Sequence, residues 1–147
     1  PSHDPHPMML RMLYGIDLGT SGLILQAQSR EEILADKMIA LAFRENRLKN
    51  RDLWDIVWLT QQGVELPSGL IPVKICDHKR TAADFSRLLD ERLLALGSQA
   101  RLRQEFVKEM QRFLPATTVR DTVAKAPFWT YLTGVVTDLG RAAVAAL

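Results

Sequence analysis

Helical spacing of the apolar residues, sustained from residue 29 to the C-terminus, is the feature that most constrains the fold of this chain. After Ser29 the apolar side chains recur at helical spacing, at Ile33, Leu34, Met38, Leu41 and Ala42. Ser29 is followed three residues later by Glu32, a pattern typical of a capping box at a helix start. These signals predict a helix of about 17 residues that ends at Glu45 or Asn46.

Glycine and proline divide the rest of this region into further helices. The second helix is expected to run from about Arg51 to Gln62 and to end at Gly63, a favoured C-cap. A stretch with two prolines and a glycine at 67–72 predicts a loop. Beyond it the expected helices lie at about 73–78, 81–96, 99–113, 117–125 and 128–146. We therefore expect residues 29–147 to form a helical C-terminal domain, a bundle of about six helices.

Residues 1–28 have a different pattern and are expected to form a β segment at the edge of this bundle. Three prolines and three glycines break up any helix there. Residues 23–27 alternate in the manner of a short strand. The predicted fold class is therefore α+β, mostly α, with a short two-stranded β element at the N-terminal edge.

Composition excludes several classes of protein. The 147 residues suit one domain with a buried core, and the net charge of +2 permits a nucleotide or nucleic-acid partner without requiring one. A single cysteine, Cys76, cannot form an internal disulfide, which agrees with a reducing cytoplasm. The apolar stretch near 135–147 is interrupted by Asp138 and Arg141, so it is too polar to span a membrane. The scattered histidines provide no metal-ligand spacing.

Charged residues on the first two helices are candidates for binding chemistry. Lys37 and Arg44 are seven positions apart, so both project from one side of the first helix. Two such cations can bind a polyphosphate. Lysine contributes a point charge, and arginine donates two parallel N–H bonds. Asp52 and Asp55 project together from the first turn of the second helix, where a carboxylate also stabilises the helix dipole. The same spacing allows an alternative, a solvated salt-bridge face that contributes little to stability, made of Lys37, Asp36, Arg51 and Asp52.

The order of these motifs is also that of a known family. The run EEILADK ends at Lys37, a basic turn containing Arg44 follows, and the second helix begins with RDLWDI at Arg51. This order resembles the C-terminal motif region of the AbiEii/AbiGii nucleotidyltransferase toxins, a type IV toxin–antitoxin and abortive-infection family. The match extends nearly throughout residues 29–59. Beyond residue 63 only the pattern of helices is similar.

The resemblance implies a role for each charged residue. Lys37 would contact the phosphates of a nucleotide, and Asp52 or Asp55 would activate the acceptor hydroxyl as a general base. Arg44 and Arg51 would be supporting cations at the phosphates. We expect the two helices to bring Lys37 and one or both aspartates to a common cleft. The implied reaction transfers nucleotides from an NTP onto tRNA or another RNA acceptor.

The chain departs from the family in its metal site. Members carry an Asp-x-Asp pair that binds Mg²⁺, and neither Asp-x-Asp nor Asp-x-Glu occurs in this sequence. We therefore expect a C-terminal half, with residues 1–28 as the remainder of a missing N-terminal nucleotidyltransferase sheet. Mg²⁺ and NTP would bind the intact enzyme, whereas the chain alone is expected to hold neither and to be inactive by itself.

An unpaired β edge at residues 8–28 would need a partner, because an isolated pair of short strands is marginal in water. We expect either the missing N-terminal half or self-association through residues 8–28 to cover it, in a cytoplasmic protein without a membrane partner. The alternative from a different class is a non-catalytic helical interaction module, or a subunit that completes a partner's active site. An upstream in-frame segment encoding the Asp-x-Asp pair would favour the enzyme.

Overall fold

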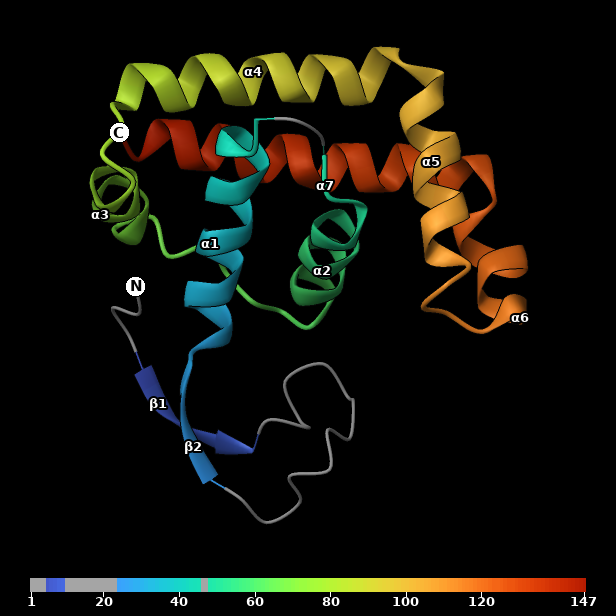
Figure 1. Cartoon of the computed structure of the whole chain (residues 1–147), viewed down its shortest axis with the longest axis horizontal. Helices are drawn as coiled ribbons and strands as arrows, with labels where there is room; N and C mark the ends of the chain where they lie inside the picture. Colours follow the sequence, from blue (N-terminus) through green and yellow to red (C-terminus); the bar gives the residue numbers. More distant parts are fainter. Residues whose placement is uncertain (1–4, 10–23, 46–47) are drawn as a thin grey trace.

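The computed structural model describes the backbone of residues 5–9, 24–45 and 48–147, and the side chains of the described residues from Ser29 onward. This part of the chain is mostly helical, as predicted (Figure 1). Its seven α-helices and one π-helical segment are α1 (Arg30–Phe43), α2 (Asn50–Gln61), α3 (Leu70–Asp77), α4 (Ala82–Ser98), α5 (Ala100–Met110), α6 (Ala116–Thr118), η2 (Val119–Val123) and α7 (Ala126–Ala145). No helix in these ranges combines the length and the apolar character needed to cross a membrane.

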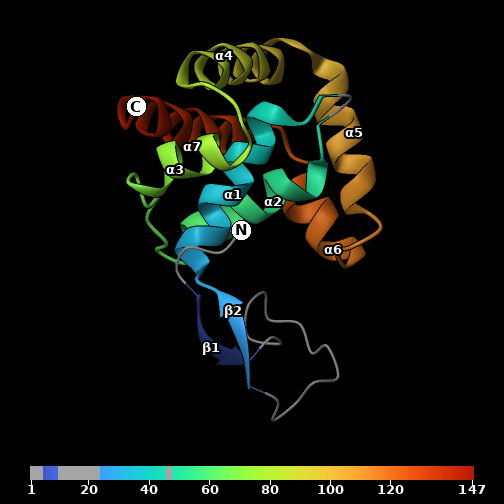
Figure 2. The same ribbon diagram turned by 60° about the vertical axis from the view of Figure 1, so that its left-hand side comes forward.

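Two short strands precede the bundle. β1 (Pro5–Met9) and β2 (Ile24–Gln28) pair antiparallel. In Figures 1 and 2 this pair lies beyond the N-terminal end of α1, on the side away from α4. Only the backbone of these strands is described, and 10–23 lie outside the described residues. The sheet edge expected at residues 1–28 and the self-association expected through 8–28 therefore stay predictions.

The helices pack in layers around α1. α4 and α7 run side by side and cover one end of α1, while α3 packs beside α1 and α5 packs beside α2 (Figures 1 and 2). The apolar spacing predicted for the first helix is confirmed, because Leu34, Met38 and Leu41 are buried. They join a core drawn from α1 to α5 and α7, whose other large, fully buried apolar side chains include Ile39, Leu53, Ile56, Leu59, Ile71, Phe85, Leu89, Leu96 and Phe106.

A group of aromatic side chains packs α5 and α7 against α2. The ring of Phe106 on α5 lies 6.2 Å from Phe128 and 5.5 Å from Trp129, both in the first turn of α7. Phe128 in turn lies 6.0 Å from the ring of Trp54 on α2. These centroid distances are those of favourable aromatic pairs, which contribute beyond the apolar area that they bury. The aromatic start of α7 therefore packs that helix onto the bundle.

The end of the first helix was predicted wrongly. α1 ends at Phe43 rather than at Glu45 or Asn46, because Arg44 adopts an extended backbone conformation. The side chain of Arg44 contacts Asp52 on α2, and its carbonyl oxygen accepts a hydrogen bond from Arg92 on α4. Arg92 is 48 residues away in the sequence, so no local pattern could reveal its contact with the end of α1.

Other boundaries also differ from the prediction. α3 begins at Leu70, inside the predicted loop, and Pro72 lies in its first turn, where no intrahelical N–H bond is lost. α4 continues through Gly97 to Ser98, since one glycine near a helix end costs only about 1 kcal/mol. α5 ends at Met110, short of the predicted residue 113. The single helix predicted at 117–125 is α6 followed directly by η2.

A buried ion cluster joins α3 to α1. The ammonium of Lys74 lies 2.7 Å from a carboxylate oxygen of Asp36 and 3.5 Å from one of Glu32. Lys74 and Glu32 are almost wholly buried. Ser29 caps the start of α1, because its hydroxyl accepts a hydrogen bond from the backbone N–H of Glu32, which is the Ser29 half of the predicted capping box. Lys74 was not among the predicted site residues, although a lysine within the apolar run LIPVKIC is an unusual pattern.

Candidate functional site

Lys37, Asp52 and Asp55 meet between α1 and α2. The ammonium of Lys37 lies 2.8 Å from Oδ1 of Asp52 and 3.1 Å from Oδ2 of Asp55. Lys37 comes from the middle of α1, and both aspartates come from the first half of α2. The three-residue spacing of the aspartates turns both carboxylates toward the same neighbour, as expected on a helix. The predicted convergence of these three side chains is therefore confirmed.

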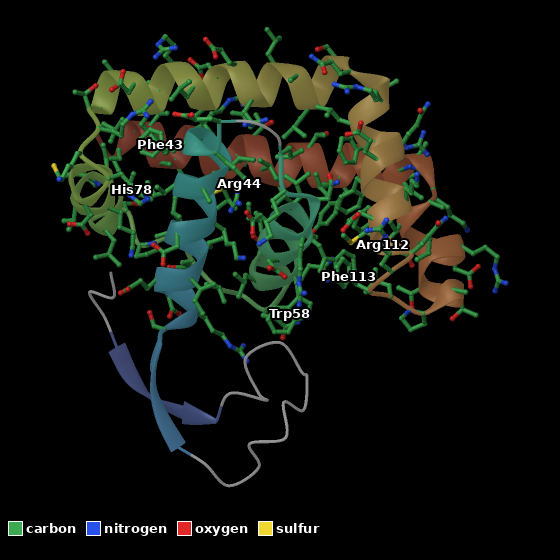
Figure 3. All side chains as sticks on the ribbon, in the orientation of Figure 1. Phe43, Arg44, Trp58, His78, Arg112 and Phe113 are labelled. Carbon is green, nitrogen blue, oxygen red and sulfur yellow. The ribbon has the colours of Figure 1, made fainter. Side chains whose placement is uncertain are left out.

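Arg44 extends this group toward α4. Its Nη2 donates to Oδ2 of Asp52 over 3.2 Å, so Asp52 is bound by a lysine and an arginine at once. Figure 3 shows Arg44 at the C-terminal end of α1. We call Lys37, Arg44, Asp52 and Asp55 the charged cluster. It contains two cations and two carboxylates, which balance each other.

The two carboxylates of the charged cluster are shielded from water, whereas the side chain of Arg44 is 42% exposed. The side chains of Asp52 and Asp55 are 4% and 8% exposed, while that of Lys37 is 22% exposed. Burial acts to lower the pKa of Lys37, but the hydrogen bond and charge of Asp52 and the charge of Asp55 outweigh it, so the pKa is raised. Burial raises the pKa of Asp55 above its ordinary value, and the charge of Lys37 offsets this only in part.

Arg51, the remaining residue of the predicted site, makes no ion pair in the charged cluster but lines the same cavity as Asp55. The guanidinium of Arg51 lies 5.0 Å from the centre of the Phe113 ring, and its charge acts on Asp55 only as a minor influence. Asp36 pairs with Lys74 on α3. Of the alternative salt-bridge face, the Lys37–Asp52 pair between the two helices is present, but Asp52 is buried rather than solvated, and Asp36 and Arg51 contact other residues.

Cavities lie on two sides of the charged cluster. Asp55 lines one of about 270 Å³, together with the aromatic side chains of Trp54, Trp58 and Phe113. Figure 3 shows Trp58 and Phe113 on the same side of the molecule. Arg44 lines another of about 420 Å³ near α4. Asp55 is thus the carboxylate of the cluster that faces a cavity, whereas Asp52 is enclosed by Lys37 and Arg44.

The charged cluster does not fit a magnesium ion. Mg²⁺ needs oxygen ligands in octahedral geometry and usually takes carboxylates that are free to bind it. Here Asp52 binds Lys37 and Arg44, and Asp55 binds Lys37. Within the described ranges, no group of three or more His, Cys, Asp or Glu residues is arranged to hold a metal ion. The Mg²⁺ expected from the resemblance is therefore not assigned to these residues.

A pH dependence of stability follows from the raised pKa of Asp55. When the pH rises above 3.8, the unfolded chain releases this proton before the folded protein does, so the folded state loses stability. The free energy of unfolding of the wild type, relative to Asp55→Asn, should therefore fall as the pH rises above this value and level off once the folded protein has also released the proton. Urea unfolding at a series of pH values measures this difference.

The exposed Asp138 on α7 offers a matched control. Asp138→Asn removes one carboxylate from an exposed rather than a buried position, and its unfolding is measured in the same series. A wild-type protein that gains stability relative to Asp55→Asn as the pH rises would contradict the raised pKa.

Comparison with known protein families adds a match that covers most of the chain. A family model described as "Nucleotidyl transferase AbiEii toxin, Type IV TA system" matches residues 3–133. This range contains the whole charged cluster and both cavities beside it. No curated protein and no solved structure matches the chain.

Proposed function

The chain belongs to the AbiEii nucleotidyl transferase toxin family of type IV toxin–antitoxin systems, and on this premise we propose that its charged cluster takes part in nucleotidyl transfer. The family suggests a nucleotidyltransferase toxin with nucleotide substrates and an antitoxin partner. The proposal rests on one observation: the partly exposed ammonium of Lys37 lies within hydrogen-bonding distance of two buried carboxylates. These are the residue types that neutralise a phosphate and accept a proton.

Lys37 is the proposed phosphate-binding residue. An ammonium has three N–H donors, and the contacts to Asp52 and Asp55 engage two of them. Because Lys37 is partly exposed, a phosphate oxygen of an NTP can take the remaining donor. Arg44 supplies a second cation at the edge of the same group. Asp52 holds both cations in place and is therefore proposed as a positioning residue.

Asp55 is the proposed general base. Its raised pKa makes it a stronger proton acceptor than an ordinary aspartate. When the phosphates of a bound NTP contact the ammonium of Lys37, its ion pair with Asp55 weakens. The carboxylate of Asp55 can then accept a proton on its cavity side. A hydroxyl of tRNA or another RNA acceptor then attacks the α-phosphorus, its proton passes to Asp55, and pyrophosphate leaves. Residues outside the charged cluster would bind the Mg²⁺ ion.

The test uses the protein at its natural length, labelled NTPs, Mg²⁺ and total tRNA. Wild-type protein should incorporate label into RNA. Asp55→Asn should lower the rate by about 100-fold or more, with little change in NTP affinity, because it removes the proton acceptor and keeps the shape. Lys37→Met should weaken NTP binding by about 10-fold, because it removes a charged contact to phosphate.

Matched controls are Asp138→Asn on α7 and Lys108→Met on α5, both at exposed positions. Each should retain the wild-type rate and affinity. Circular dichroism establishes that the variants are folded. Absence of labelling with every NTP, or an Asp55→Asn protein with the wild-type rate, would contradict the proposal.

A further inference from the structure

A second group of cations lies where the C-terminal end of α1 meets α4. Arg44, Arg80 and Arg92 line the cavity of about 420 Å³, whose apolar lining includes Phe43 and Leu88. Figure 3 shows Phe43 and Arg44 together at this end of α1. We call it the arginine cavity. Its volume falls within the usual range for sites that bind small ligands, about 300–1,000 Å³.

Arg92 places spare hydrogen-bond donors beside this cavity. Its Nε donates to the carbonyl oxygen of Leu41 over 3.2 Å, and its Nη2 donates to that of Arg44 over 2.6 Å. A guanidinium carries about five N–H donors, so these two bonds leave others for a ligand. Burial, and then the charge of Arg44, lower the pKa of Arg92. Two like charges close to each other are stabilised when an anion binds between them.

Arg80 adds a third cation from the turn before α4. Its guanidinium lies 4.9 Å from the centre of the Phe43 ring, which holds it at the cavity wall. Glu45 and Glu91 also line the cavity. Glu91 lies 3.6 Å from Arg87, an arginine outside the lining, which takes up part of its charge. Carboxylates outside the lining take up part of two of the positive charges as well, since Arg80 lies 3.7 Å from Asp84 and Arg44 lies 3.2 Å from Asp52. Arg92 differs from both, because its hydrogen bonds in the described part of the chain go to backbone carbonyl oxygens.

We propose that the arginine cavity binds a phosphate group, carried by an RNA backbone or by a nucleotide. A guanidinium can donate two parallel N–H bonds to phosphate oxygens, which makes arginine well suited to this ligand. The apolar part of the lining strengthens each charged contact relative to water. This site goes beyond the proposed function, since Arg80 and Arg92 take no part in that chemistry. It adjoins the charged cluster through Arg44.

The experiment measures binding of two probes to the protein at its natural length. A short fluorescein-labelled single-stranded RNA is followed by fluorescence polarisation, and ATP is followed by calorimetry. Arg80→Gln should raise the Kd of the probe that uses the cavity by about 10-fold. If RNA is the ligand, Arg80→Gln should also reduce the slope of the logarithm of the binding constant against the logarithm of the salt concentration by about 0.7. Arg80→Lys should raise the Kd by an intermediate amount, since lysine keeps the positive charge but lacks the two parallel N–H donors of a guanidinium.

The matched control is Arg101→Gln on α5, an exposed arginine whose replacement changes the net charge equally. Weaker binding of RNA alone identifies a backbone phosphate, and weaker binding of ATP alone identifies a nucleotide phosphate. Either result supports the arginine cavity. Equal Kd values for Arg80→Gln and Arg101→Gln with both probes overturn it. Lys37→Met and Asp55→Asn test the proposed function separately, since neither residue lines this cavity.

Discussion

Lys74→Ala should destabilise the protein by about 3–5 kcal/mol, the usual cost of removing one partner from a buried ion pair. Lys74 is 1% exposed, and its ammonium lies 2.7 Å from Asp36 and 3.5 Å from Glu32. Because Glu32 is fully buried, the variant leaves a carboxylate in the interior without this cation. Urea unfolding at neutral pH, followed by circular dichroism, measures the loss.

Two further variants separate charge from packing. Lys125→Ala removes a lysine from an exposed position and should change the free energy of unfolding by at most about 0.5 kcal/mol. The double variant Glu32→Gln with Lys74→Met removes both buried charges and should recover much of the stability. A loss in Lys74→Ala no larger than that in Lys125→Ala would show that the ion cluster contributes little.

Phe106→Ala should cost a similar amount, about 3–5 kcal/mol, through a different mechanism. The side chain of Phe106 is fully buried, and its ring contacts those of Phe128 and Trp129 at the start of α7. Truncation removes apolar burial and leaves a cavity where α5 meets α7, because the helices around it can collapse only in part. Urea unfolding measures the loss under the same conditions.

The same truncation at Phe113 provides the control. Phe113 is 50% exposed, so Phe113→Ala removes less buried area and should cost clearly less than Phe106→Ala. Phe106→Leu, which keeps most of the volume, should fall between the wild type and Phe106→Ala. Equal losses in the two alanine variants would mean that Phe106 does not anchor α5 to the bundle.

The charges of α1 are divided between two neighbours. Asp36 and Lys37 are adjacent in sequence, yet Asp36 contacts Lys74 on α3 and Lys37 contacts Asp52 and Asp55 on α2. Adjacent residues on a helix do not share a face, and this separates the two groups. Stability tests at Lys74 and activity tests at Lys37 therefore examine different contacts of the same helix.

The sequence alone predicted the helical character of residues 29–147, because the periodic burial of apolar side chains along a helix is a local property. Ser29 marked the start of α1, and the spacing of Asp52 and Asp55 placed both carboxylates on one side of α2. The pairing of these carboxylates with Lys37 was also anticipated, from the order of two motifs and a family resemblance.

Only the tertiary structure decided which charges meet and how deeply they are buried. The end of α1 depends on Asp52 and Arg92, and the buried cluster at Glu32 depends on Lys74, which is 42 positions away. Contacts between residues so distant leave no periodic signal in the chain, since their cause is the packing of whole helices. The same packing enclosed Asp52, left Asp55 facing a cavity and brought Arg92 beside Arg44, which set the chemistry available at each position.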